Sequence, residues 1–170
     1  MLADVWGNRA PAIAAQLGLP VSGTPRPVVL HPDPVLRVTC TPASGDLRQL
    51  AADMLATIYT APGRGLAAPQ IGETIRLFVM DSGWKDGRPQ PLVAINPEIL
   101  APSDDTVTRE EGCLSIPGQP VRVTRPATVT LRFTDLLGGA HSLRLSGFDA
   151  ACAQHETDHL NGRLILDYKT

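Results

Sequence analysis

Two histidines near the end of the sequence, His155 and His159, are four positions apart, and Glu156 directly follows the first. On a helix, residues at this spacing project from the same face, so both imidazoles could bind a single metal ion. A carboxylate beside such a pair is placed to take a proton from a water molecule that the metal activates. The alternative is an ordinary helix with two partly buried histidines. Because the chain has only four histidines and two fall in this pattern, we favour a metal site.

The residues around this pattern predict a helix whose ligand face points into the protein. Ser146 with Asp149 has the pattern of an N-terminal cap, and Asn161 with Gly162 that of a C-terminal stop. A metal on a buried face would be partly shielded from water, where charges interact more strongly. The stripe at helical spacing that carries both histidines consists of Phe148, Ala151, Cys152, His155 and His159.

A catalytic site of this kind uses about three protein ligands and leaves one position for water. The short segment after His159 contains Asp167 as its only carboxylate and no histidine or cysteine, so we expect the third ligand upstream. Cys113, preceded by the flexible Gly112, is the favoured candidate, and His141 is its rival. Cys152 lies on the predicted helix itself, and we expect it to line the pocket.

Composition limits the class of protein. A chain of 170 residues with 43% hydrophobic and 19% charged residues is typical of one globular domain with a real core. The net charge of −2 argues against nucleic-acid specificity, which would require a basic face. Three cysteines without tight pairing favour a reducing cytoplasm. No run approaches the roughly 18 apolar residues of a membrane span, and the N-terminus lacks the pattern of a signal peptide, so we expect no membrane association.

The pattern of the chain predicts an α+β fold in which antiparallel strands separate two main helices. Helices are expected over residues 46–59 and around the paired histidines, with a short one over 8–17 that ends at Gly18, followed by an extended linker over 20–27. Residues 103–109 read as a polar stretch, and Pro97 is expected to end a strand. The expected strands cover residues 28–30, 75–80, 92–96, 121–123, 128–133 and 140–145.

A glycine-rich segment, GRGLAAPQ at residues 63–70, follows the first long helix. It lacks the Lys-Ser/Thr pair of a phosphate-binding loop. Its backbone is free of side-chain bulk and could approach a substrate closely. Gln70 at its end could present an amide donor, although a tight turn with an incidental glutamine would have the same pattern.

Three segments together resemble the motifs of peptide deformylases, in the same order: GRGLAAPQ at 63–70, EGCLS at 111–115 and HETDH at 155–159. The resemblance runs from about residue 27 to residue 168. It implies antiparallel β-sheets around a central metal-binding helix. Residues 27–170 would form the catalytic domain, and residues 1–26 would be an N-terminal extension or linker.

The resemblance also implies a reaction, the removal of the N-formyl group from the initiator methionine of new polypeptides, with release of formate. Cys113, His155 and His159 would bind one divalent metal ion, typically Fe(II), which Zn(II) or Ni(II) can replace. Glu156 would be the general base and then the acid. Gln70 and the backbone N–H of Leu114 would stabilise the oxyanion. The partners would be N-formylmethionyl nascent peptides, met at the ribosome exit in the cytoplasm.

The substrate would bind against Arg64, Gly65, Phe148 and Ala151, with the last two forming the methionine pocket. Arg64 departs from the family pattern, which usually has an aliphatic residue there, and could alter specificity at the rim of the site. Many relatives have a further C-terminal element, and we expect residues 1–26 to pack in its place. Two alternatives remain at this point: a zinc metallopeptidase, and a deformylase-like protein that binds formylated peptides or metal without turnover.

Overall fold

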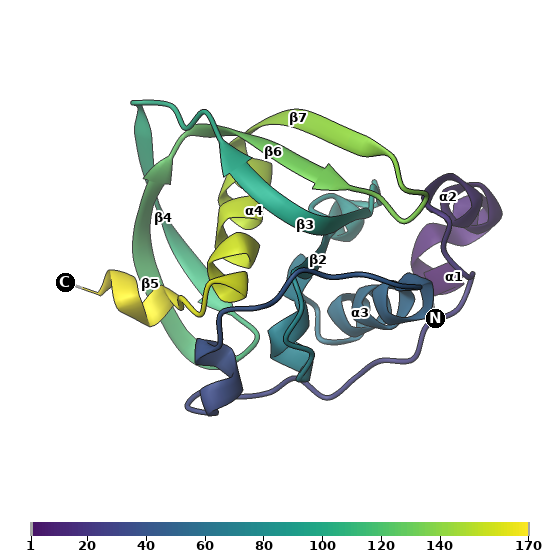
Figure 1. The fold of residues 1–170 in the computed structure, drawn as a ribbon, viewed down its shortest axis with the longest axis horizontal. Helices are drawn as coiled ribbons and strands as arrows, with labels where there is room; N and C mark the ends of the chain where they lie inside the picture. The colour runs from purple at the N-terminus through teal and green to yellow at the C-terminus, as the bar shows by residue number, and fades with distance from the viewer. Residues whose placement is uncertain (1, 170) are drawn as a thin grey trace.

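The computed structural model describes residues 2–169 and places the helix with the paired histidines, α4 (Gly147–Leu160), at the centre of the molecule (Figure 1). A larger antiparallel sheet lies on one side of this helix and a two-stranded hairpin on the other. The predicted α+β fold, with antiparallel sheets around this helix, is therefore confirmed. The other helices are α1 (Leu2–Trp6), α2 (Ala10–Leu17) and α3 (Arg48–Thr60). The strands are β1 (Gly65–Ala67), β2 (Leu77–Met80), β3 (Leu92–Leu100), β4 (Thr106–Cys113), β5 (Ile116–Pro126), β6 (Thr128–Thr134) and β7 (Ala140–Ser146).

The larger sheet has the order β1-β2-β3-β6-β7 with every neighbouring pair antiparallel. The expectation that Pro97 ends a strand is wrong, because β3 continues to Leu100 through an irregularity between Ile95 and Glu98. Asn96 adopts a φ of 50° there. Its side chain accepts from Ala43 N–H at 2.8 Å and donates to Ala43 O at 3.0 Å. This irregularity lets Pro97, which has no backbone N–H group, lie within the strand.

Strands β4 and β5 form the separate hairpin, whose long pairing starts at Thr106 opposite Pro126. The polar stretch at 103–109 therefore contributes to a strand, because alternate side chains of β4 face solvent. The short strand expected at residues 28–30 is absent from the described sheets. The backbone of this segment instead bonds to two residues outside the strands. Val29 N–H donates to Gln70 O at 2.7 Å, and His31 N–H donates to Ser115 O at 2.9 Å.

Apolar side chains cluster in three places that together hold α4 and the sheets. One cluster joins α1, α2 and α3 to β2, a second lies between α4 and the larger sheet, and a third lies beneath the hairpin. The predicted stop after the histidines is confirmed, since Asn161 caps α4 and Gly162 has a φ of 72°. Ser146 occupies the N-cap position, although its side chain makes no capping hydrogen bond.

The N-terminal segment is packed against α3, on the side of the molecule away from the hairpin (Figure 1). The predicted short helix is confirmed as α2, with Pro11 in its first turn and Gly18 closing it at a φ of 71°. Helix α1, which the sequence pattern did not indicate, buries Leu2 and Trp6 almost completely. None of the helices within residues 2–169 has the length and apolar character needed to cross a membrane.

Candidate active site

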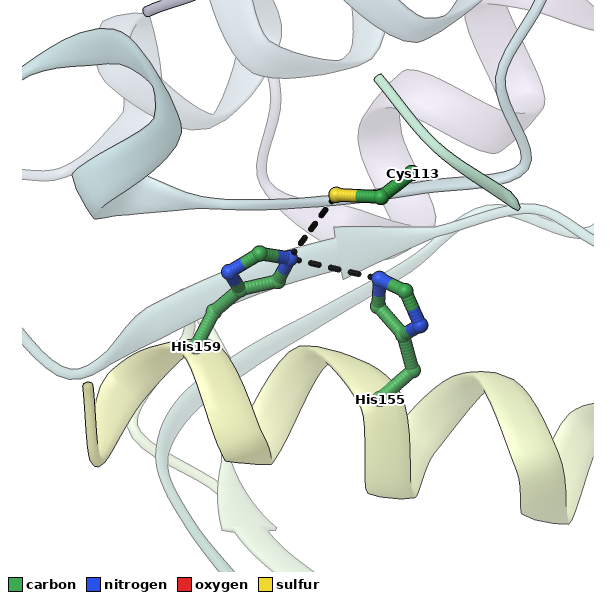
Figure 2. A group of neighbouring side chains, drawn as sticks. All are labelled: Cys113, His155 and His159. Carbon is green, nitrogen blue, oxygen red and sulfur yellow. Dashed lines mark hydrogen bonds between the residues drawn. The ribbon is translucent and has the colours of Figure 1, made fainter. Parts of the chain in front are cut away.

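Three potential metal ligands converge between β4 and α4 (Figure 2). Cys113 ends β4, and His155 and His159 project from successive turns of α4. His159 Nε2 lies 3.4 Å from Cys113 Sγ and 3.2 Å from His155 Nε2, and all three ligand atoms lie within 4.8 Å of one another. His141, the rival third ligand, is on β7, where its Nε2 lies 2.5 Å from Asp135 Oδ2. The structure therefore brings the histidine pair together with Cys113 and not with His141.

The chemistry of these donors fits a bound cation. His155 Nδ1 lies 3.0 Å from Glu111 Oε2 and can donate to it, which leaves the Nε2 lone pair directed at the other ligands. Two imidazole nitrogens at 3.2 Å need a proton or a cation between them. One thiolate with two imidazoles is a donor set that suits zinc or iron rather than magnesium or calcium. These residues therefore fit a divalent transition metal.

A buried ion-pair network holds Glu111 against His155. Both oxygens of Glu111 accept from the Arg125 guanidinium, at 2.6 and 2.9 Å, and Arg125 also donates to Asp158 Oδ2 at 2.8 Å. Tyr168 completes the network by donating to the same Asp158 oxygen at 2.7 Å. Burial alone would raise the pKa of Glu111, but the bonds from Arg125 and His155 outweigh it and lower the pKa to about 2. Glu111 therefore stays ionised and fixes the ring of His155.

Sequence reasoning missed Glu111, Arg125 and Asp158, although two signals were present. Glu111 lies two positions before Cys113, so on a strand both side chains point to the same face. Arg125 continues the inward positions of Val121 and Val123 on β5, and it is only 4% exposed. A charge at an inward position needs a buried partner.

The pKa values of Glu156, His155 and His159 are shifted in different directions. Burial raises the pKa of Glu156 to about 7, and its Oε2 atom has no hydrogen-bond partner among the described residues. Burial holds the pKa of His159 well below its ordinary value, which keeps this imidazole neutral. Burial would also lower the pKa of His155, but hydrogen bonding to Cys113 and Glu111 outweighs it and raises the pKa to about 10. A cation at this place would therefore compete with a proton on His155.

A cavity of about 460 Å³ opens in front of these residues. The glycine-rich segment forms one wall of the cavity, and a Cβ atom on Gly65 would lie only 2.5 Å from Glu156 Oε1. Gln70 is 2% exposed; it accepts from Ala67 N–H at 2.9 Å and donates to Ser115 Oγ at 3.1 Å. The predicted site residues that line the cavity are Arg64, Gly65, Gln70, Cys113, Leu114, Phe148, Ala151, His155 and Glu156.

Phe148 differs from its expected place on a buried stripe. Ala151 and Cys152 are buried, but Phe148, on the first turn of α4, is 49% exposed at the mouth of the cavity. The Arg64 guanidinium lies 5.5 Å from the centre of the Phe148 ring and 3.5 Å from Asp86. Arg64 and Phe148 therefore meet at the rim of the cavity.

A buried carboxylate beside a Cys-His-His ligand set, in a cavity large enough for a short peptide, defines a metal-dependent hydrolase. Residues 25–170 match the family model described as polypeptide deformylase. The peptide deformylase of Rhizobium meliloti (strain 1021) is 47% identical over 148 residues, which cover 85% of each chain. That of Rhodopseudomonas palustris (strain BisA53) is 48% identical over 148 residues, which cover 84% of this chain and 82% of the relative.

Solved structures agree with these relatives. The peptide deformylase from Thermotoga maritima superimposes with a TM-score of 0.81 at 38% identity, covering 86% of this chain and 98% of that one. The enzyme from Legionella pneumophila gives a TM-score of 0.82 at 38% identity, covering 86% and 87%. The chain belongs to the peptide deformylase family. Its reaction is the removal of the formyl group from the N-terminal methionine of nascent peptides, at an intact Cys-His-His metal site.

Proposed function

We propose that Glu156 carries the proton in deformylation, and that Gln70 and the backbone N–H of Leu114 bind the developing oxyanion. The observation that carries this proposal is the position of Glu156. Its side chain is 4% exposed, lines the cavity beside the three metal ligands, and has an Oε2 atom without a described partner. A carboxylate with a pKa of about 7 can accept a proton and return it near neutral pH.

A divalent cation bound by Cys113, His155 and His159 would lower the pKa of a water molecule and polarise the formyl carbonyl. Glu156 removes a proton from the attacking water as its oxygen bonds to the formyl carbon. Glu156 then gives this proton to the methionine nitrogen as the carbon–nitrogen bond breaks. The products are formic acid and a peptide with a free amino terminus. Near neutral pH the acid passes its remaining proton to the amine, which gives formate and an ammonium group, so all atoms and protons are balanced.

Both proposed oxyanion donors line the cavity close to Cys113. Gln70 is fixed by Ala67 and Ser115, and its Nε2 atom is also 3.6 Å from Cys113 Sγ. Leu114 directly follows Cys113, so its backbone is anchored beside the metal ligands. Donors held rigidly before the reaction stabilise developing charge without reorganisation.

The proposed substrate-binding residues form the wall and mouth of the same cavity. Ala151 lies one turn before His155 on α4 and offers a small apolar surface for the methionine side chain. The absence of a side chain at Gly65 lets Glu156 lie close against this wall of the cavity. Arg64 and Phe148 would contact the residues that follow the methionine. The peptide deformylase from Acinetobacter baumannii has been solved with bound Met-Ala-Ser, which supports a tripeptide as the assay substrate.

We further propose Fe(II) as the native metal, with Zn(II) or Ni(II) as functional replacements. The soft thiolate ligand supports a transition metal of this kind. The cytoplasm, at the ribosome exit, is the proposed place of encounter with formylated chains. Residues 27–170 are proposed as the catalytic domain, with residues 1–26 as an extension.

The test compares formyl-Met-Ala-Ser with acetyl-Met-Ala-Ser, using protein purified without oxygen. We expect a free methionine amino group to form from the first substrate only, with release of formate, together with about one metal ion per chain by elemental analysis. Reloading the metal-free protein with Fe(II), Zn(II) or Ni(II) should rank Fe(II) highest in turnover. Cleavage between methionine and alanine would indicate a metallopeptidase instead. Metal and peptide binding without formate would indicate a protein that has lost turnover.

A further inference from the structure

One wall of the cavity is a short run of backbone, residues 62–65, which we call the glycine wall. This wall has little freedom to move inward. A Cβ atom on Gly63 would lie 2.8 Å from Leu114 Cδ1, and one on Gly65 would lie 2.5 Å from Glu156 Oε1. The position of the glycine wall therefore sets the width of the cavity between two residues of the proposed machinery.

The glycine wall is held from outside by a second segment, residues 81–85, which follows β2. Asp81 N–H donates to Arg64 O at 2.8 Å, and Trp84 Nε1 donates to Gly63 O at 2.7 Å. The Lys85 ammonium donates to the carbonyl of Pro62, and the Arg64 guanidinium donates to that of Ser82. These hydrogen bonds fix the wall relative to residues 81–85, so any shift of that segment moves the wall.

Tyr59 on α3 connects this segment to the helical core. Its hydroxyl donates to Asp81 Oδ2 at 2.8 Å, and its ring meets that of Trp84 edge-on, with centroids 5.2 Å apart. Asp81 is completely buried, and its other oxygen accepts from Gln90 N–H at 3.0 Å. A buried carboxyl with both oxygens bonded holds the start of residues 81–85 in one place.

Trp6 on α1 completes the series. Its Nε1 donates to the Tyr59 hydroxyl at 2.9 Å, and Trp6 itself is 1% exposed. An indole N–H can only donate, whereas a tyrosine hydroxyl has a single proton. Because the hydroxyl of Tyr59 accepts from Trp6, its own proton is directed to Asp81. Trp6 thus orients the bond that holds residues 81–85.

We propose that Trp6 is a positioning residue for peptide binding, acting through the Tyr59 hydroxyl on the glycine wall. The family match begins at residue 25, so this support comes from a part of the chain outside it. The inference rests on the proposed function, because the effect is on the binding of the formylated peptide. It gives the N-terminal extension a role in substrate affinity.

The test measures kcat and KM for formyl-Met-Ala-Ser in Trp6→Phe, Tyr59→Phe and the double variant. Trp6→Phe keeps an aromatic ring but loses the N–H group. We expect KM to rise about two- to tenfold, the range that corresponds to the net contribution of one hydrogen bond, with kcat changed less than twofold. Since both residues act through one hydroxyl, the double variant should have the KM of Tyr59→Phe alone.

The matched control is Leu19→Ala, which removes buried volume from the same apolar cluster but no atom of the hydrogen-bonded series. It should lower the Tm and leave KM unchanged. An unchanged KM in Trp6→Phe, an additive double variant, or an equal KM change in Leu19→Ala would overturn the inference.

A second readout separates this inference from the proposed function. Hydrogen exchange at the amides of residues 63–65 and 81 should be faster in Trp6→Phe than in wild type and Leu19→Ala, whether or not formate is released. Equal exchange in all three proteins would overturn the positioning role. A wild-type protein that releases no formate would contradict the proposed function alone.

Discussion

At the metal centre, Arg125 is 4% exposed and bonds to Glu111 and Asp158 at distances between 2.6 and 2.9 Å. At the mouth of the cavity, Phe148 is 49% exposed, and Arg64 reaches Asp86 at 3.5 Å. Breaking a buried ion pair by removing one partner leaves an uncompensated charge and costs about 3–5 kcal/mol. An exposed pair is worth about 0–1 kcal/mol. The two regions should therefore respond to substitution on very different scales.

The largest effect is expected from Glu156→Gln, which removes the proton carrier but keeps the shape of the side chain. We expect kcat to fall about 10²–10⁴-fold, the contribution typical of general acid–base catalysis. Metal content, measured by elemental analysis, should stay at the wild-type level because Glu156 is outside the ligand set. Loss of metal in this variant would give Glu156 a structural role at the centre.

Gln70→Leu should follow, with kcat lower by about 10²–10³-fold, as for removal of one oxyanion donor. KM should change little, because the donor acts on charge that develops during the reaction. The matched control is Ser115→Ala, which removes the same Gln70–Ser115 hydrogen bond from the other side. A similar fall in kcat in the control would mean that the effect comes from loss of the Gln70–Ser115 hydrogen bond and not from donation to the oxyanion.

Glu111→Gln should weaken metal affinity about 10- to 100-fold, as for other partners that orient a metal-binding histidine. The neutral amide no longer balances Arg125, and it holds the His155 ring less firmly. Competition with a chelator of known affinity measures this change. The control, Glu110→Gln, removes the same charge from the adjacent exposed position of β4, and equal weakening there would indicate a general charge effect.

The two regions also differ in how far the sequence predicts them. His155 and His159 could be paired from sequence because helical spacing alone places them together. The segment after them has no histidine or cysteine, so the third ligand could be placed upstream, with Cys113 favoured over His141. The bonds of Arg125 could not be predicted, since they join positions 14 and 33 residues away, on β4 and α4.

The residues at the mouth of the cavity were harder to predict, because the exposure of a helical side chain depends on which other elements cover it. Phe148 shares the helical stripe of Ala151, yet the fold leaves Phe148 itself 49% exposed. The support from Trp6 depends on a contact across 53 residues, and no local pattern indicates it. Spacing along one element is thus readable from sequence, whereas partnerships between elements require the fold.

Arg64→Leu tests the mouth and should have the smallest effect. The variant loses the contacts of the guanidinium with Phe148 and Asp86, both at exposed positions and each worth about 1 kcal/mol or less. It also loses the hydrogen bond from the guanidinium to the Ser82 carbonyl. The glycine wall keeps its hydrogen bonds from Asp81 N–H, the Trp84 indole N–H and the Lys85 ammonium. We therefore expect KM for formyl-Met-Ala-Ser to change by about threefold or less, with kcat and metal content unchanged.

Asp86→Asn provides the control for Arg64→Leu, because it breaks the ion pair but leaves the guanidinium over the Phe148 ring. If the ring contact shapes the mouth, this variant should bind the peptide as wild type does. A peptide with glutamate after the methionine sharpens the test, since only a free guanidinium at the mouth would favour it. A tenfold or larger fall in kcat for Arg64→Leu would show that the mouth and the metal centre are mechanically coupled, and that burial alone does not separate them.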